Sequence, residues 1–576
     1  MNGAIGCLRF ALFCVLLLPP LAAGAQPNFV VLLVDDAGFM DFGGFGGEAS
    51  TPHIDQLADQ GVRFSNYHTS PLCAPSRAML LTGMDNHRTG VATIPEILAD
   101  EQKGSPAYAL HLQPGVLTIA DRLRERGYQA FMTGKWHLGR GEGDLPNSHG
   151  FDRSFVLDAS GADNWEQKSY MPYYAEAPWF EDGEPATLPD DFYSSRFLVD
   201  RMMAYLEARD RSRPFLAYVA FQAVHIPVQA PREFVDRYAG VYAQGWHATL
   251  ARRFERARAL GLVPPGAEPP AMHPALRTWS ELTEAEQTHY ERSMMANAGM
   301  LEAMDHHVGR LVSYLQSTGD LDDTVFIVTS DNGPEFGDPG AAPSFRLWMR
   351  ANGYHTDPER AGQRGYLGAI GPEWASAAAA PGSLFKMYAS EGGTRVPLVI
   401  RVPGIMHEGF RSSLSFVTDI APTIAELAGL ARPDDMDGHS LVPLLRGESS
   451  DVYAEAEPVG LEVAGNSALF KGRYKLTRNT LPHGDGQWRL HDLLSDPAEA
   501  VDLSESLPDL RRELLADYAR YAASVGVVEL PDDFDIQKQL GANIVGVLLA
   551  RYLPVLVGAG VLGLLLLVLL VARLRR

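Results

Sequence analysis

The run NFVVLLVDD, residues 28–36, is a continuous uncharged stretch that ends in two aspartates, Asp35 and Asp36. Its apolar character predicts a strand buried on both faces, as in a parallel sheet. Two adjacent carboxylates at the end of such a strand repel each other and are costly to bury unpaired. A divalent cation would relieve both costs. A solvated turn is the alternative, and it explains one aspartate better than two.

Further apolar runs predict more strands, and segments with apolar residues at helical spacing predict helices. The predicted strands are 128–133, 214–221, 323–329 and 396–402, and the predicted helices are 51–58, 117–126, 198–209, 284–318 and 418–428. This alternation is typical of an α/β fold in which helices flank a large, mostly parallel or mixed sheet.

Polar side chains follow several predicted strands closely. They are Asp35, Asp36, Lys135, His137, His225, Asp331 and Asn332. In open sheets of this type, ligands bind beyond the carboxyl ends of the strands. The shared placement therefore predicts one functional site at that edge of the sheet.

Cys73 is expected to be the only thiol of the mature protein, because Cys7 and Cys14 lie in an N-terminal segment that we expect to be removed. Pro75 favours a helix start, which would place Cys73 where the helix dipole lowers the pKa of a thiol. Arg77, one turn on, would add a fixed positive charge that suits oxyanions. The alternative is a small buried hydrophobic residue. The local pattern leaves both interpretations open.

Both ends of the chain carry apolar segments. Residues 1–25 have an arginine before a short apolar run and small residues at positions 23 and 25, which predicts a cleaved signal peptide. Residues 552–572 are uncharged and precede three arginines, which predicts a transmembrane helix with a cytoplasmic C-terminus. We therefore expect an exported, single-pass protein at the periplasmic face of the inner membrane.

The composition suits a large body without disulfides, since 46 % of the residues are hydrophobic. The formal net charge of −22 argues against nucleic acid as a partner. We predict a catalytic domain at 26–447, an α+β C-terminal subdomain at 448–530 and a polar linker at 531–551. The subdomain would contain antiparallel strands at 453–463, 467–476 and 488–494 and a helix at 508–525. Residues 334–385, rich in glycine, alanine and proline, are expected to form a long loop region.

Five motifs together resemble the type I sulfatases of the alkaline phosphatase superfamily, in particular the larger bacterial arylsulfatases. The motifs are Cys73-Ala74-Pro75-Ser76-Arg77, Gly134-Lys135-Trp136-His137-Leu138-Gly139, Asp35-Asp36, Asp331-Asn332-Gly333, and Lys386 five residues before Glu391-Gly392-Gly393. The resemblance extends from about Asn28 to about Leu503 and implies an alkaline phosphatase-like fold. One motif alone is weak, but five in this order beside suitable strands make chance a poor explanation.

The resemblance implies that a formylglycine-generating enzyme oxidises Cys73 to formylglycine (3-oxoalanine). The hydrated aldehyde would be held by one divalent cation and would attack the sulfur of a sulfate ester. The cation would be Ca²⁺ in preference to Mg²⁺ or Mn²⁺. Its implied ligands, besides residue 73, are Asp35, Asp36, Asp331 and Asn332.

The resemblance also implies roles for the remaining site residues. Arg77 would support the nucleophile, and Lys135 and Lys386 would bind sulfate oxygens. His225, alone or with Lys386, would protonate the leaving alcohol. His137 would take the proton whose removal expels sulfate. A structural histidine is the alternative interpretation of His225.

Two other functions are compatible with the residues. One is a phosphodiesterase or phosphonate monoester hydrolase that uses the same site, and the other is a non-catalytic anchored protein that binds sulfated ligands. The organic part of the ester, whether phenol, sterol, sugar or alkyl alcohol, has no readable motif. The loops at 140–195, 230–285 and 334–385 are expected to shape its pocket.

Overall fold

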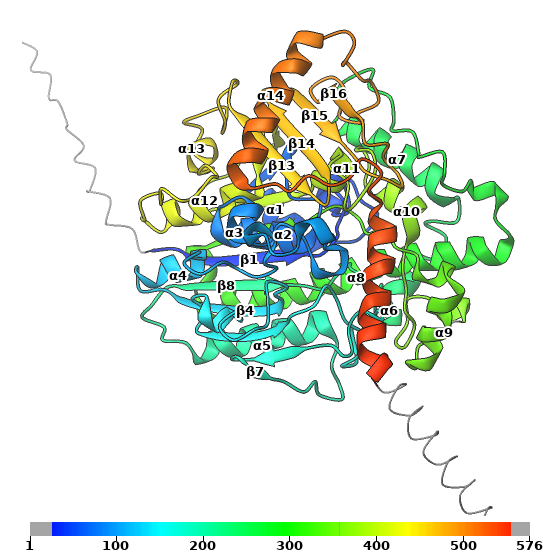
Figure 1. The fold of residues 1–576 in the computed structure, drawn as a ribbon. Coiled ribbons are helices and arrows are strands. Elements are labelled where there is room, and N and C mark those ends of the chain that lie inside the picture. Colours follow the sequence, from blue (N-terminus) through cyan, green and yellow to red (C-terminus); the bar gives the residue numbers. More distant parts are fainter. Residues whose placement is uncertain (1–25, 356, 555–576) are drawn as a thin grey trace, which may run out of the picture.

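The computed structural model describes residues 26–355 and 357–554 of the chain (Figure 1). The predicted signal peptide at 1–25 lies outside these residues, as do positions 555–572 of the predicted membrane span. Within the described ranges, no helix combines the length and the apolar character needed to cross a bilayer.

A ten-stranded sheet occupies the centre of the molecule, in the order β11-β2-β10-β9-β1-β8-β4-β5-β6-β7 (Figure 1). Its strands are β1 (Asn28–Val34), β2 (Val62–Phe64), β4 (Gln129–Lys135), β5 (Arg153–Leu157), β6 (Trp179–Glu181), β7 (Glu184–Pro185), β8 (Phe215–Ala220), β9 (Thr324–Ser330), β10 (Leu398–Arg401) and β11 (Phe410–Arg411). Two short strands, β3 (Tyr67–His68) and β12 (Ser415–Phe416), pair separately.

β1 is the middle of this sheet. All of its residues are buried, and it runs parallel to β8 on one side and β9 on the other. β4 and β5 continue the parallel arrangement beyond β8, whereas β10 is antiparallel to β9. The predicted α/β fold with a large mixed sheet is confirmed. The carboxyl ends of β9, β1, β8 and β4 meet at one edge, where ligands bind in such sheets.

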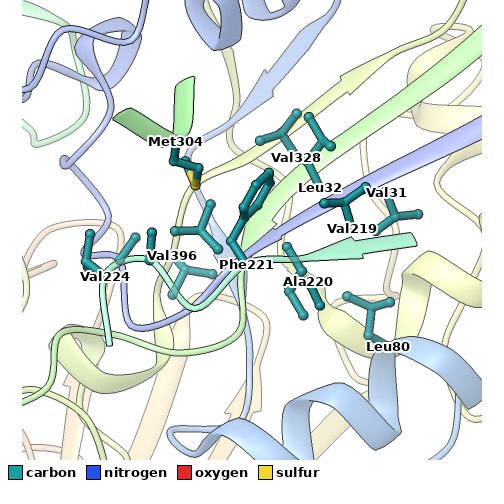
Figure 2. Packing of buried hydrophobic residues seen from close by; sticks show 14 of the residues in the cluster. Val31, Leu32, Leu80, Val219, Ala220, Phe221, Val224, Met304, Val328 and Val396 are labelled. Carbon is teal, nitrogen blue, oxygen red and sulfur yellow. The ribbon is translucent and has the colours of Figure 1, made fainter. Parts of the chain in front are cut away.

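Helices cover both faces of the sheet. Figure 2 shows Leu80 of α2 and Met304 of α8 on opposite sides of the strands that carry Val31 and Val328. α1 and α5 contact α8, and α4 and α12 contact α2. The helices are α1 (Pro52–Asp59), α2 (Cys73–Thr82), α3 (Asn86–Thr89), α4 (Ile119–Arg124), α5 (Ser194–Ala208), α6 (Arg232–Val235), α7 (Gly245–Ala259), α8 (Glu284–Thr318), α9 (Pro343–Ala351), α10 (Gly371–Ala378), α11 (Glu391–Thr394), α12 (Ile420–Leu427), α13 (Val442–Leu445) and α14 (Pro508–Val525).

A smaller antiparallel sheet follows in the C-terminal part, as predicted. It consists of β13 (Pro458–Val463), β14 (Asn466–Lys471), β15 (Tyr474–Arg478) and β16 (Trp488–Asp492), with α14 packed against it. The stretch 467–476, predicted as one strand, is instead a hairpin. Its turn falls at Gly472, whose φ of +57° suits glycine.

Two other segments differ from the sequence-based expectation. The loop region predicted at 334–385 contains α9 and α10, because good helix formers occur in both: leucine, methionine and arginine in α9, and alanine in α10. Residues 536–554, most of which fall in the predicted polar linker, form a further helix.

His87 of α3 connects the main body to the small sheet. Its Nε2 lies 2.8 Å from Glu462 Oε2 in β13, and its Nδ1 lies 3.1 Å from Asp85 Oδ1. Burial disfavours the charged ring, but the hydrogen bonds to the two carboxylates outweigh burial and raise the pKa of His87 to about 9. The protonated ring therefore stabilises this junction at neutral pH.

We expect His87→Gln to lower the melting temperature in a pH-dependent way. The folded pKa is raised above the ordinary value of 6.5, so the charged ring contributes fully below that pH. The contribution is lost as the pH rises through about 9. Thermal unfolding should be measured at about pH 6 and about pH 9.5. The difference in melting temperature between wild type and variant should be smaller at the higher pH. The control is His247→Gln, a substitution of an exposed histidine. An equal difference in melting temperature at both pH values would contradict a stabilising role for the protonated His87 ring.

Candidate active site

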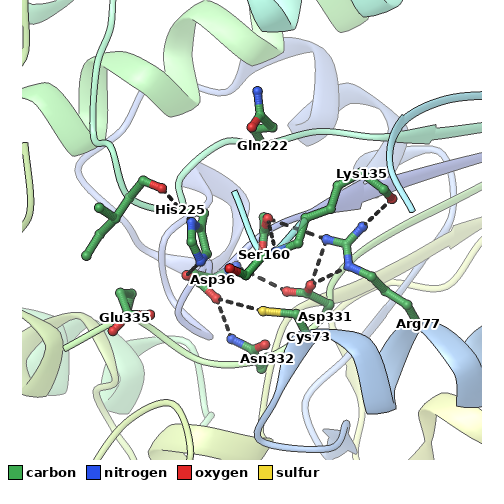
Figure 3. Close-up of polar contacts among 12 residues, drawn as sticks. Asp36, Cys73, Arg77, Lys135, Ser160, Gln222, His225, Asp331, Asn332 and Glu335 are labelled. Carbon is green, nitrogen blue, oxygen red and sulfur yellow. Dashed lines mark hydrogen bonds and ion pairs between the residues drawn. The ribbon is translucent and has the colours of Figure 1, made fainter. Parts of the chain in front are cut away.

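The structure brings all ten predicted site residues together at the carboxyl edge of the main sheet. Figure 3 shows part of this group, with Asp36, Cys73 and Asp331 at its centre. They are Asp35, Asp36, Cys73, Arg77, Lys135, His137, His225, Asp331, Asn332 and Lys386, and each is at most 6 % exposed. The strands position most of them, since two aspartates follow β1, Asp331 and Asn332 follow β9, and Lys135 ends β4. The expectation of one shared location is met.

Backbone geometry next to these strands is restricted. Asp36 has a φ of 65° and His137 a φ of 60°, both in the left-handed region that side chains other than glycine rarely adopt. At Gly134, with φ of 105°, a Cβ atom would lie 1.7 Å from the carbonyl oxygen of Ala220. Only glycine therefore permits β4 to approach β8 closely just before Lys135.

Buried carboxylates and cations alternate across the site. Lys135 Nζ lies 2.9 and 2.7 Å from the two carboxylate oxygens of Asp35, and Lys386 Nζ lies 2.9 Å from Asp36 Oδ2. Arg77 donates through Nε and Nη2 to Asp331 Oδ2 at 2.9 and 2.7 Å. Each acidic group thus has a cationic partner, which offsets the cost of burying both charges.

This pairing does not offset the full cost of burying Asp35 and Asp36 as charged groups. Burial and repulsion from Asp331 raise the pKa of Asp35, although Lys135 opposes the shift. Burial likewise raises the pKa of Asp36, against the attraction of Lys386. Carboxylates held in this way favour an additional cation.

The donor set fits a hard divalent cation. Ligand atoms of Asp35, Asp36, Asp331 and Cys73 all lie within 4.8 Å of one another. Asn332 donates through Nδ2 to Asp36 Oδ1 at 2.6 Å, but its buried Oδ1 has no hydrogen-bond partner among the described residues. Three carboxylates and one unpaired amide oxygen are the oxygen ligands that Ca²⁺ takes.

Cys73 is the first residue of α2 and is 1 % exposed. Its thiol donates to Asp36 Oδ1 at 3.9 Å, so the sulfur points at the carboxylates (Figure 3). The prediction that the helix N-terminus lowers the thiol pKa is wrong. Burial raises the pKa of Cys73 well above its ordinary value and outweighs the attraction of Lys135. An unmodified cysteine would therefore be a protonated, weak nucleophile here.

The two histidines are buried and uncharged. Burial, followed by repulsion from lysines, lowers the pKa of both His137 and His225 well below the usual range. His225 Nδ1 lies 2.6 Å from the carbonyl oxygen of Ile226 and must donate to it, which leaves Nε2 facing Asp36 Oδ2 at 3.7 Å. Neither ring nitrogen of His137 has a hydrogen-bond partner in the described chain.

Sequence reasoning missed Glu335. Its carboxylate lies 2.9 Å from Lys386 Nζ, and with Asp36 and His225 it forms a second acidic group of metal-binding geometry. The sequence feature that could have indicated Glu335 is its position three residues after Asn332, on the same loop. Three more polar residues near His225 had no recognisable motif. Two of them, Ser160 and Gln222, are labelled in Figure 3, and the third, Tyr170, packs against the His225 ring.

Glu391, which helped to identify Lys386, does not lie in the site. It is buried between His68 Nε2 at 3.0 Å and Lys475 Nζ at 2.8 Å. Its role is therefore to join α11 to β3 and β15, which fixes the loop on which Lys386 is carried.

Comparisons with known proteins agree with this geometry. The family described as Sulfatase matches residues 27–430, and the family described as N-sulphoglucosamine sulphohydrolase, C-terminal, matches residues 382–515. An uncharacterized sulfatase of Schizosaccharomyces pombe is 35 % identical over 89 % of this chain and 96 % of its own length. An arylsulfatase of Klebsiella aerogenes is 33 % identical over 73 % of this chain and 90 % of its own.

Solved structures show the same fold at lower identity. The crystal structure titled Ps i-CgsB aligns with a TM-score of 0.62 and 22 % identity, covering 92 % of this chain and 99 % of that one. A structure titled BT4656 in complex with its substrate D-glucosamine-2-N,6-O-disulfate aligns with a TM-score of 0.59 and 21 % identity, covering 89 % of this chain and all of that one. From the family match, the identities and the buried acidic site, this chain belongs to the sulfatase family and is a sulfuric ester hydrolase.

Proposed function

We propose that this enzyme is an arylsulfatase-type hydrolase whose nucleophile is made from Cys73. The observation that carries the proposal is the placement of the Cys73 side chain among three carboxylates, two lysines and an arginine. A buried, protonated thiol is unsuited to attack, whereas formylglycine at this position would supply a hydroxyl once hydrated. A formylglycine-generating enzyme would be the partner in maturation.

The cation would be held by Asp35, Asp36, Asp331 and Asn332 together with residue 73. Ca²⁺ fits this all-oxygen set better than Mg²⁺ or Mn²⁺, because Ca²⁺ accepts several carboxylates in flexible geometry. When bound, it would add positive charge beside the reacting group.

Lys135 and Lys386 would bind the sulfate oxygens. Both are buried, and pairing with Asp35 and Asp36 respectively raises their pKa against the effect of burial, so both stay charged. In a site that excludes water, such fixed charges stabilise an anionic group strongly. Arg77 already donates to Asp331 and to the Lys135 carbonyl oxygen at 2.8 Å, so its role would be to hold α2 and its first residue in place.

His225 would protonate the leaving oxygen through Nε2, because Nδ1 is committed to the Ile226 carbonyl oxygen. Its lowered pKa makes the ring neutral in the free protein, so it would gain its proton as the anionic ester binds. His137, with both nitrogens free of hydrogen bonds in the described chain, would accept the proton that accompanies release of sulfate.

Export to the periplasmic face of the inner membrane, with residues 552–572 as the anchor, is also part of the proposal. It is supported by the apolar segments at the two ends of the sequence and by the three C-terminal arginines.

The first test concerns residue 73. We expect a peptide containing it, from protein made in the native host, to carry an aldehyde in place of the thiol by mass spectrometry. Cys73→Ala should lower kcat/KM on 4-nitrophenyl sulfate by about 1,000-fold or more. Leu494→Gln, an exposed change, is the control. Unmodified cysteine in fully active enzyme would refute the proposal, as would a much higher kcat/KM on a 4-nitrophenyl phosphate diester than on the sulfate.

The second test separates proton donation from binding. His225→Gln should reduce kcat on an alkyl sulfate by roughly 100-fold or more, because a poor leaving group needs a proton. The loss on 4-nitrophenyl sulfate should be far smaller, since nitrophenolate leaves without one. An equal loss on both esters would mean that His225 has only a structural role.

The third test concerns the cation. Ca²⁺ at about 100 times its Kd should stabilise the fold by about 2.7 kcal/mol, seen as a higher melting temperature. Asp36→Asn should abolish most of this increase, and the exposed Asp322→Asn should keep it. If Asp36→Asn responds to Ca²⁺ like wild type, the assigned ligand set is incorrect.

A further inference from the structure

The helix at residues 536–554 has two unlike faces. Its inner face packs on the body, where Ile536 is 1 % exposed and Leu540 and Ile544 contact the main core. Its outer face is exposed and apolar, with Val545, Leu549, Tyr552 and Leu553 each more than half exposed. Gly541, Ala542, Gly546 and Ala550 are exposed as well.

This outer face contradicts the usual pattern of a surface helix, which is polar towards water. Residues 539–550 contain no charged side chain, and only Lys538 and Arg551 carry charge in the whole helix. Val545, Leu549 and Leu553 recur every four residues and so form one continuous stripe. We call this stripe, together with Tyr552, the apolar stripe.

The helix is also fixed to the segments that surround the active site. Asn543 Nδ2 donates to the carbonyl oxygen of Glu96 at 3.0 Å, and Arg551 Nη2 donates to that of Tyr173 at 2.9 Å. Figure 1 shows the helix, in red, across the end of the sheet at which β1 and β8 stop. It therefore lies on the same side of the molecule as the site.

A short chain of contacts connects these segments to His225. Glu96 Oε1 accepts a hydrogen bond from Ser160 Oγ at 2.6 Å, and Ser160 Oγ lies 2.7 Å from Tyr170 Oη. The Tyr170 ring packs edge-on against the His225 ring, with 5.3 Å between centroids. The leaving-group side of the site is thus built from the loops that the helix holds.

We propose that the apolar stripe rests on a lipid bilayer and that the enzyme takes an amphiphilic sulfate ester from that surface. The sequence favours a bilayer as the partner of the apolar stripe, because the stripe is followed directly by residues 555–572, which contain no charge. Tyr552 stands at this junction, where aromatic side chains favour the membrane–water interface. The substrate class rests on the proposed sulfatase activity, whereas the membrane contact rests on the proposed anchor at residues 552–572 and not on that activity.

The kinetic test uses the full chain reconstituted in dioleoylphosphatidylcholine vesicles. Two esters are compared, hexadecyl sulfate carried in the vesicles and 4-nitrophenyl sulfate in water. The double variant Leu549→Gln, Leu553→Gln should lose about tenfold or more of kcat/KM on the vesicle-borne ester. Activity on the soluble ester should be unchanged, and Leu494→Gln, exposed to a similar extent but on the small domain, should alter neither. An unchanged ratio of the two activities would overturn the substrate class.

The second measurement needs no activity. Tryptophan introduced as Leu549→Trp should add fluorescence that brominated phosphatidylcholine quenches, whereas Leu494→Trp should not be quenched. Absence of quenching at position 549 would overturn the membrane contact. If the wild-type protein forms a detergent-stable dimer and the double variant is a monomer, the apolar stripe contacts a second copy of the chain. That result would also overturn the membrane contact. Quenching at 549 with no turnover of either ester would instead mean that the proposed function has failed and the membrane contact stands.

Discussion

The structure depends on the charge balance at the end of β1. Asp35 and Asp36 are placed by a fully buried strand in the middle of the main sheet, so neither can turn towards water. Lys135 from β4 and Lys386 from the loop before α11 approach them within hydrogen-bond distance. Burying one carboxylate without a partner would cost several kcal/mol. Pairing of these charges therefore brings together segments that are more than three hundred residues apart in the sequence.

This constraint links fold to catalysis. The cations that make the acidic cluster tolerable are the groups suited to hold an anionic sulfate, and the acidic cluster in turn keeps the lysines charged inside the protein. Neither set is stable in the interior without the other. An inner position that is dry and strongly polar is the environment in which fixed charges act most strongly on a reacting group.

Much of the fold and the site could be predicted from the sequence because strands with continuous apolar runs end in polar side chains at a common edge. The residues at strand ends, such as Asp331, needed only the parallel arrangement to be placed. Glu335 escaped because it follows a strand by several residues, where a carboxylate has no distinguishing neighbour. Helices α9, with nine residues, and α10, with eight, escaped because helices this short depend on tertiary packing, which the glycines and prolines around them do not reveal. The pKa of Cys73 was misjudged because burial, which a local motif does not reveal, exceeds the effect of a helix end.

The burial of residue 73 has a consequence for the order of events in making this protein. The Cys73 side chain is enclosed by α2, the ends of β1 and β9, and the loop that carries Lys386. Under the proposed function a second enzyme oxidises the Cys73 side chain, and the folded protein leaves that side chain only 1 % exposed. We therefore expect the oxidation to precede closure of the sheet. The fold would then enclose the finished group, so that each molecule would have a single opportunity to become active.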